Sequence, residues 1–266
     1  MENDQLAVRL NAPTISSDHR AEYLQQLVAP MDDMWAAFAD MADPHGLMVG
    51  NDVAGFCCVD RNRRLLRFYV KPRYQHRSEK LLRCALRELD VACLIVYTLD
   101  PNYLSTALDI ATHVASHSLL FSHATEPQAP ALGPLRLAEA DDHDSIVDFQ
   151  ALEIGAPRDF LNHYVGQRLE RSEVLLYESD GDIICAGELR RDQQQAGISQ
   201  LRLIVRKSDR GKGIGTQMLS SLVTRSRDEG LAPYCSTEIT NLGARRAIER
   251  VGFRARHRVL RVEFEV

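Results

Sequence analysis

A glycine-rich turn between a short apolar run and an amphipathic run constrains the fold of this chain most. The apolar run is Leu201-Arg-Leu-Ile-Val205, the turn is Arg210-Gly-Lys-Gly-Ile-Gly-Thr216, and apolar residues then recur at helical spacing. A strand that turns sharply into a helix directs backbone N–H groups at one point, where the positive end of the helix dipole also lies. Glycines let a phosphate approach that backbone closely. The sequence therefore predicts a phosphate-binding strand–loop–helix unit within an α/β or α+β fold.

The spacing of the glycines argues against two common phosphate-binding loops. A P-loop needs Ser or Thr directly after its lysine, and Lys212 is followed by Gly213. A dinucleotide-binding turn that begins at Gly211 or Gly213 needs its last glycine at position 216 or 218, where Thr216 and Met218 stand. The pattern that remains is Arg-x-x-Gly-x-Gly.

This remaining pattern, formed by Arg210, Gly213 and Gly215, resembles the coenzyme A pyrophosphate loop of the GNAT superfamily of N-acetyltransferases. Two later segments, Asn241-Leu-Gly-Ala244 and Arg250-Val-Gly-Phe253, resemble further motifs of that family in the expected order. The resemblance implies a splayed, mixed sheet, acetyl-CoA as cosubstrate and no metal. It also implies which residues hold the cofactor. These are Leu203, Ile204, Val205, Arg210, Gly211, Lys212, Gly213, Ile214, Gly215, Thr216 and Asn241.

The candidate catalytic residue is Glu188, which ends the run Ile183-Ile-Cys-Ala-Gly-Glu188 on the strand that lines the acceptor side in relatives. A carboxylate there could act as general base toward an amine. The competing interpretation is a salt bridge from Glu188 to Arg190 or Arg202. The family often has a tyrosine seven residues after the asparagine to protonate the leaving thiolate, but Ile248 stands there and fits a core stripe of its helix.

Three further groups of residues could belong to a site: a His-Tyr pair, two histidines and the cysteines. His163 and Tyr164 could belong to the acceptor pocket, because the family draws its lid from this region, or to an ordinary helix surface. His113 and His117 stand four residues apart, but no third ligand follows at a recognised spacing, so we expect no metal site. Cysteines lack a Cys-x-x-Cys spacing and lie in apolar runs, so we expect buried free thiols.

An internal repeat divides the chain. Three prolines and a glycine between Ala124 and Pro134 indicate an extended linker. On either side, Val70 aligns with Val205, Gln75 with Arg210 and Asn102 with Asn241. The stretch 75–80 contains no glycine, so the first copy is expected to have lost its cofactor site. We predict a degenerate GNAT-like domain over 1–125, a linker over 126–134 and an acetyl-CoA-binding domain over 135–266, each domain a mixed, mostly antiparallel twisted sheet flanked by helices.

Composition limits the classes of partner that we expect for this chain. The formal charge of −5 argues against nucleic acid as the main partner. The amino terminus lacks the pattern of a secretory signal and no apolar run approaches about 18 residues, so we expect a cytoplasmic protein without a membrane span. A monomer with an internal pseudo-dimer and a homodimer are both compatible with a tandem chain.

The predicted function is an N-acetyltransferase in which a small-molecule or protein amine attacks acetyl-CoA directly in a ternary complex. The alternative is a non-catalytic acyl-CoA-binding sensor or regulatory module, which the isoleucine at 248 favours. A third, weaker possibility is another phosphate ligand, such as a nucleotide, in the same loop. The sequence does not identify the acceptor.

Overall fold

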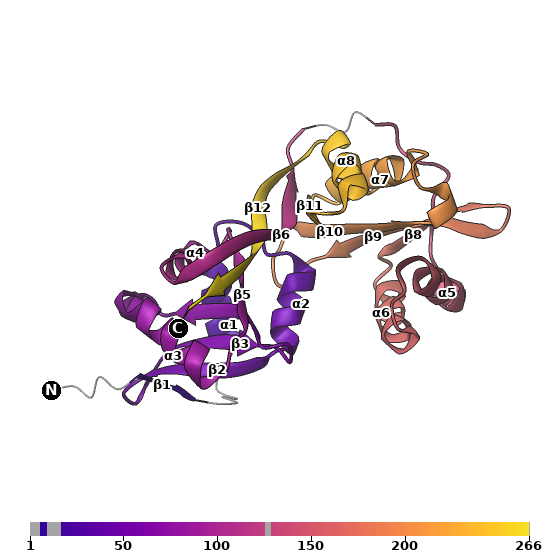
Figure 1. The fold of residues 1–266 in the computed structure, drawn as a ribbon. Coiled ribbons are helices and arrows are strands. Elements are labelled where there is room, and N and C mark those ends of the chain that lie inside the picture. Colours follow the sequence, from indigo (N-terminus) through magenta and orange to yellow (C-terminus); the bar gives the residue numbers. More distant parts are fainter. Residues whose placement is uncertain (1–5, 10–16, 126–128, 266) are drawn as a thin grey trace. The chain divides into compact units, whose positions relative to one another are not determined.

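The computed structural model describes residues 6–9, 17–125 and 129–265 of the chain. Contacts divide the chain into two units, each with its own strands and helices (Figure 1). The first unit comprises Met1–Leu119 together with His257–Val266, and the second comprises Leu120–Arg256. The two units are described separately below.

The first unit is built on a mixed sheet with the order β1-β2-β3-β4-β5-β12. Neighbouring strands are antiparallel except β4 and β5, which are parallel. The strands are β1 (Leu6–Arg9), β2 (Asp43–Val49), β3 (Asp52–Val59), β4 (Arg64–Val70), β5 (Cys93–Tyr97) and the carboxyl-terminal part of β12 (Phe253–Phe264). A further strand, β6 (Ala111–His123), leads from this unit into the second.

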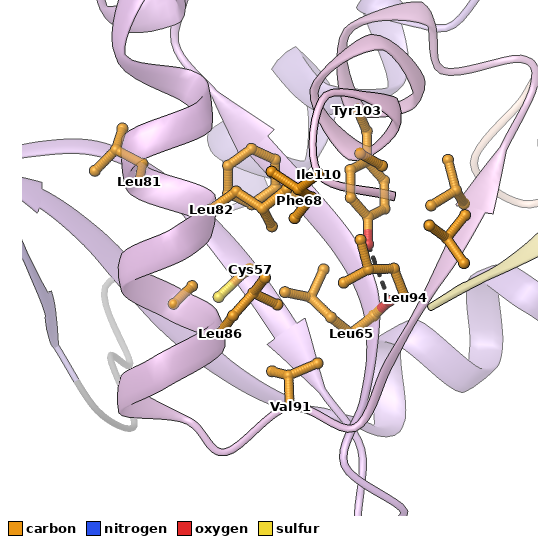
Figure 2. Close-up of a cluster of buried hydrophobic side chains, with 14 of the residues drawn as sticks. Cys57, Leu65, Phe68, Leu81, Leu82, Leu86, Val91, Leu94, Tyr103 and Ile110 are labelled. Carbon is orange, nitrogen blue, oxygen red and sulfur yellow. Dashed lines mark hydrogen bonds between the residues drawn. The ribbon is translucent and has the colours of Figure 1, made fainter. Parts of the chain in front are cut away.

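Four α-helices and one short 3-10 helix complete the first unit. They are α1 (Ser17–Gln26), α2 (Asp33–Met41), η1 (Pro72–Arg77), α3 (Ser78–Glu88) and α4 (Pro101–Leu108). Leu81, Leu82 and Leu86 form one stripe of α3 and pack into the core shown in Figure 2. The Tyr103 hydroxyl of α4 reaches this core and donates a hydrogen bond of 3.2 Å to the carbonyl oxygen of Leu65.

The second unit repeats this plan, with the sheet order β11-β10-β9-β8-β7. Strands β7 to β10 are antiparallel to their neighbours, whereas β10 and β11 are parallel. The strands are β7 (Arg136–Leu137), β8 (Val174–Ser179), β9 (Asp182–Arg191), β10 (Ile198–Val205) and β11 (Ala232–Glu238). Asp180 and Gly181 both have positive φ in the turn between β8 and β9, as the two central residues of a type I′ hairpin turn do.

Helices cover both faces of the second sheet. They are η2 (Ala140–Asp142), α5 (His143–Ile154), α6 (Arg158–Glu170), η3 (Lys207–Asp209), α7 (Ile214–Asp228) and α8 (Leu242–Arg250). A Cβ added to Gly187 of β9 would lie 2.7 Å from the sulfur of Met218, so α7 packs closely on that face. Ala186, whose side chain points to the opposite face, packs with α5 and α6. Each unit is thus a mixed, mostly antiparallel sheet flanked by helices, as predicted.

The internal repeat is evident in two local features. In each unit the parallel pair of strands stays paired only near its start, over Arg64 and Leu65 of β4 and over Ile198 to Gln200 of β10. In each unit a polar side chain then caps the next helix: Asp100 accepts from the N–H three residues on, and so does Asn241. Asp100 rather than Asn102 is therefore the counterpart of Asn241, which corrects the alignment made from the sequence.

The carboxyl-terminal strand does not follow the division predicted from the sequence, which placed all of 135–266 in one domain. Val259 pairs with Tyr97 and Val262 with Leu94, and Val262 is fully buried in the core of the first unit. Alternating apolar residues predict a half-buried strand, but they do not specify which sheet it joins.

The predicted linker 126–134 falls partly on residues 126–128, outside the described residues. Residues 129–134 have no regular secondary structure and lie along α7. Ser220 donates to the carbonyl oxygen of Ala129, and the N–H of Leu132 donates to Ser221 Oγ, each at 2.8 Å. These bonds attach the segment to the second unit.

Two general expectations can be compared with the structure. All six cysteines are free and buried, as predicted. Among the described residues, no helix combines the length and the apolar character needed to cross a membrane.

A buried polar cluster lies against β4 in the first unit. The Arg67 side chain is 2% exposed, its Nη1 lies 3.0 Å from Asp40 Oδ1, and its guanidinium lies 4.9 Å from the centre of the Tyr23 ring. Asp100 is fully buried nearby, and this burial raises the pKa of its carboxyl to about 6. The folded protein therefore holds the Asp100 proton more tightly than the unfolded chain does.

We predict that Asp100 makes the protein less stable as the pH rises from about 4 to about 6. Between these values the folded state carries the proton and the unfolded state does not, which corresponds to a loss of about 3 kcal/mol. Asp100→Asn keeps the oxygen that caps α4 and removes the titration. Denaturant unfolding at several pH values should give a flatter profile for the variant, whereas parallel profiles would contradict the prediction.

Candidate functional site

The second unit has a strand edge that its neighbour leaves open. The parallel pairing of β10 with β11 ends at Gln200 and Tyr234, although β10 continues to Val205 beside β9. The Arg206 N–H donates to the carbonyl oxygen of Ile184 at 2.9 Å, which fixes the alternation of the antiparallel ladder. The N–H and C=O groups of Leu203 and Val205 therefore point away from β9, toward the side from which β11 has diverged.

Ile204, the third strand residue predicted to hold the cofactor, is placed differently. By the same alternation its N–H and C=O groups point to β9. Its side chain packs against the apolar cluster under α5 and α6. Leu203 and Val205 thus present backbone groups to the open edge, whereas Ile204 contributes packing.

The predicted glycine loop follows directly, after the short helix η3. Gly211 and Gly213 have φ values of 81° and 87°, and Gly213 caps α7 with no side-chain hydrogen bond to the first turn. A Cβ added to Gly215 would lie 3.4 Å from Val205 and 3.5 Å from Leu203, so the start of α7 lies against the open part of β10. The backbone N–H groups at the start of α7, including those of Ile214, Gly215 and Thr216, have no side-chain cap.

Lys212 is positioned by an acidic residue within the loop. Asp209 lies 2.8 Å from Lys212 Nζ and 2.6 Å from Arg206 Nε. Hydrogen bonds from Lys212 and then Arg206 hold the pKa of the Asp209 carboxyl well below its ordinary value. The Lys212 side chain is 61% exposed, so its ammonium group can also meet an anion in solution.

Arg210, expected among the cofactor residues, binds the protein itself. Its Nε donates to the Val205 carbonyl oxygen at 3.0 Å, and its Nη2 lies 3.3 Å from Glu153 Oε2. Glu153 is buried at the end of α5, and the same oxygen accepts the Lys207 N–H at 2.7 Å. Sequence reasoning missed Glu153, because a single glutamate between Leu152 and Ile154 matches no motif.

Asn241 caps α8, and Ile248 lies within that helix. Asn241 Oδ1 accepts the Ala244 N–H at 3.1 Å and so begins the helix. Ile248 is 7% exposed, which confirms that it is a core residue. Its side chain has no group that can transfer a proton.

Glu188 lies on the α5/α6 face of β9, opposite Arg202 of β10. It is 5% exposed, and its Oε2 accepts a hydrogen bond of 2.5 Å from the Tyr164 hydroxyl. Arg190 Nε lies 3.6 Å from the same oxygen, so the salt bridge weighed from the sequence is present. Burial, followed by the charge of Glu188, raises the pKa of the Tyr164 phenol, which keeps this donor protonated.

The two polar residues considered for the acceptor pocket separate in the structure. Tyr164 points into the unit and meets Glu188, and the ring of Phe160 stacks on it with centroids 5.6 Å apart. His163 is exposed and lies 2.9 Å from Gln167 on the same helix, as a helix surface would place it. Among the described residues, no group of three or more His, Cys, Asp or Glu side chains is placed to hold a metal ion.

Comparisons with known proteins agree with this geometry. A family model described as an acetyltransferase (GNAT) domain matches residues 14–124, and one for the acetyltransferase (GNAT) family matches residues 139–253. A GNAT-family acetyltransferase from Colwellia psychrerythraea is 31% identical, with a TM-score of 0.90 over 97% of this chain and 99% of that one. The chain therefore belongs to the GNAT family of acetyltransferases and carries two such domains in tandem.

Two more distant structures share the fold. A GCN5-related N-acetyltransferase from Sphaerobacter thermophilus is 15% identical, with a TM-score of 0.69 over 99% of this chain and 97% of that one. A tandem GNAT protein from the clavulanic acid biosynthesis pathway is 14% identical, with a TM-score of 0.67 over 98% of both chains. A search of the curated proteins found no match.

We predict that Tyr164→Phe destabilises the protein, because it removes a hydrogen bond to a buried carboxylate. The expected loss in the free energy of unfolding is about 1 to 3 kcal/mol. Tyr177→Phe, at a half-buried position of β8, is the control and should cost less than about 0.5 kcal/mol. Equal losses for the two variants in urea unfolding would show that the bond to Glu188 contributes nothing.

Proposed function

We propose that this protein transfers the acetyl group of acetyl-CoA to an amine and that its second unit holds the cofactor. One observation carries the proposal: the open edge of β10 at Leu203 and Val205 meets the uncapped start of α7 at Gly213. Main-chain groups at a free strand edge can pair with the amides of pantetheine, as in strand addition. The loop beside it offers N–H donors and a lysine to the pyrophosphate. A strand edge beside an anion site suits a ligand that carries both amide groups and a pyrophosphate.

The residues in and near the loop have different roles in holding the cofactor, and the geometry of each indicates its role. The N–H groups of the first turn of α7 face a phosphate with the positive end of the helix dipole. Lys212, positioned by Asp209, adds charge. Arg210 supports the site indirectly, because its bonds to Val205 and Glu153 join the end of β10 to α5. Asn241 positions the start of α8 through its cap.

Acetyl-CoA supplies an activated thioester, and the chain supplies the groups around it. We propose that Glu188 accepts the proton of the acceptor ammonium, so that the neutral amine can attack the carbonyl carbon. A backbone N–H on the open edge of β10 donates to the carbonyl oxygen as negative charge develops there. Tyr164 holds the Glu188 carboxylate in place through its hydrogen bond. The acceptor is a small-molecule or protein amine.

The first unit lacks the loop that this function needs. Between residues 71 and 80 no residue has a positive φ, and the 3-10 helix η1 leads straight into α3. The stretch 72–80 contains no glycine, whereas the loop of the second unit has Gly211, Gly213 and Gly215. We therefore propose one acetyl-CoA per chain, in the second unit.

Gly213→Asp is predicted to weaken acetyl-CoA binding at least about tenfold, because it places a carboxylate where phosphates would bind. Gly197→Asp is a matched control, since Gly197 also has a positive φ and open space around its Cβ position, in a turn before β10. Calorimetric titration with acetyl-CoA compares the two variants with the parent protein. Equal affinities for the Gly213 and Gly197 variants would refute the cofactor site.

Glu188→Gln is predicted to lower kcat/KM by roughly 10²-fold or more, because the amide cannot accept the amine's proton. The measurement is thiol release from acetyl-CoA over a panel of amines. Glu170→Gln, at the exposed end of α6, is the control. A kcat/KM in the Glu188 variant equal to that of the control means that another group is the base.

The second candidate function is an acyl-CoA-binding sensor without catalysis. The buried Ile248 favours it, since no proton donor stands where the family often has a tyrosine. Binding of acetyl-CoA without thiol release for any amine of the panel would identify the sensor. Thiol release that depends on the amine would identify the enzyme, with solvent or another group as the source of the thiolate's proton.

A further inference from the structure

A basic hollow lies on the surface of the second unit, over α8 and the start of β12. It has a volume of about 480 Å³ and is lined by Arg246, Glu249, Arg250 and Arg254. Arg246 and Arg250 are one helical turn apart on α8 and both are exposed. Figure 1 shows α8 beside α7 in this unit. The loop at the start of α7 contributes no residue to the hollow.

The positive charge of this hollow is not neutralised by the surrounding protein. Glu249, its single acidic residue, is bound by Arg245, which lies 2.9 Å away on the same helix. Arg246 and Arg250 form no ion pair with any described residue. Like charges four residues apart on a helix repel one another. The two arginines therefore repel each other, and a bound anion would relieve this repulsion. The hollow is positively charged although the whole chain has a net charge of −5.

Arg254 is held in place by the protein. Its Nη1 donates to the Phe253 carbonyl oxygen at 2.9 Å and to the Glu249 carbonyl oxygen at 3.4 Å, beyond the last turn of α8. These bonds engage one nitrogen of the guanidinium, and its other nitrogens bond to no described residue. Two N–H groups on one edge of a guanidinium can bind two oxygens of one phosphate in parallel. Arg254 is thus a fixed donor, and the exposed side chains of Arg246 and Arg250 beside it can move to contact a ligand.

We infer that this hollow, which we name the α8 site after its residues Arg246, Arg250 and Arg254, binds a compact phosphate-bearing anion of two or more negative charges. Three guanidinium groups around one hollow match the several oxygens of a phosphate or pyrophosphate group. An extended polyanion would need a basic stripe rather than a single hollow. The inference is independent of the acetyl-CoA site.

The test is calorimetric titration with inorganic pyrophosphate at low ionic strength. The double variant Arg246→Gln/Arg250→Gln is expected to weaken binding roughly tenfold or more, because each charge-assisted contact contributes strongly to affinity. The control is Arg191→Gln/Arg225→Gln, which removes two arginines that both pair with Glu229, a residue that does not line the hollow. It has the same change in net charge, and its affinity should stay within about twofold of the parent's.

A second pair of substitutions separates the α8 site from the α7 loop, which could also bind pyrophosphate. Arg210→Gln/Lys212→Gln alters the loop and leaves α8 intact, so pyrophosphate binding at the α8 site should persist in it. The inference is overturned if the parent protein does not bind pyrophosphate, if the α8 and control variants weaken binding equally, or if the loop variant alone abolishes it. All substituted residues are exposed except Arg191 and Arg225, which are half-buried, and circular dichroism checks that each variant is folded.

Discussion

The divergence of β10 from β11 is the feature on which the candidate site depends. A parallel strand that stays paired along its length has no free edge, whereas β10 loses its partner after Gln200 and keeps β9 through Val205. The antiparallel ladder then decides which residues are available, since only every second residue points its N–H and C=O groups to the open side. Leu203 and Val205 have this orientation. The start of α7 must lie against the same residues, and the absence of a side chain at Gly215 permits that approach.

The same divergence in the first unit has a different outcome. Arg64 and Leu65 of β4 pair with β5 and the pairing then ends, yet no left-handed residue follows between 71 and 80. Polar side chains are instead enclosed against β4, where Arg67 is bound by Asp40 and lies over Tyr23. Burial of this kind costs free energy unless each group is paired, and the Nε and Nη2 of Arg67 have no hydrogen-bond partner among the described residues. The first unit therefore keeps the strand geometry, but the residues after β4 lack the left-handed turns that Gly211 and Gly213 form in the second unit.

Sequence reasoning succeeded where local chemistry determines structure. Glycine spacing located the loop at Gly211 and Gly213, because positive φ is a property of single residues. Sequence reasoning failed where tertiary contacts determine which segments meet. The alternation in β12 did not specify that Val262 would join the first sheet, and nothing in the sequence linked Glu153 to the loop.

Glu188 illustrates both what the sequence could predict and what it could not. The sequence placed it on a strand and offered two roles, a base or a salt-bridge partner, and the structure shows that one oxygen contacts both Tyr164 and Arg190. These contacts do not exclude a role in proton transfer, because a carboxylate oxygen has more than one lone pair and Glu188 has a second oxygen. They do restrict it: a proton acceptor fixed between a phenol and a guanidinium cannot move to meet its substrate. In the mechanism that we propose, the surfaces of α5 and α6 therefore bring the acceptor amine to Glu188, so acceptor specificity should be determined by those two helices.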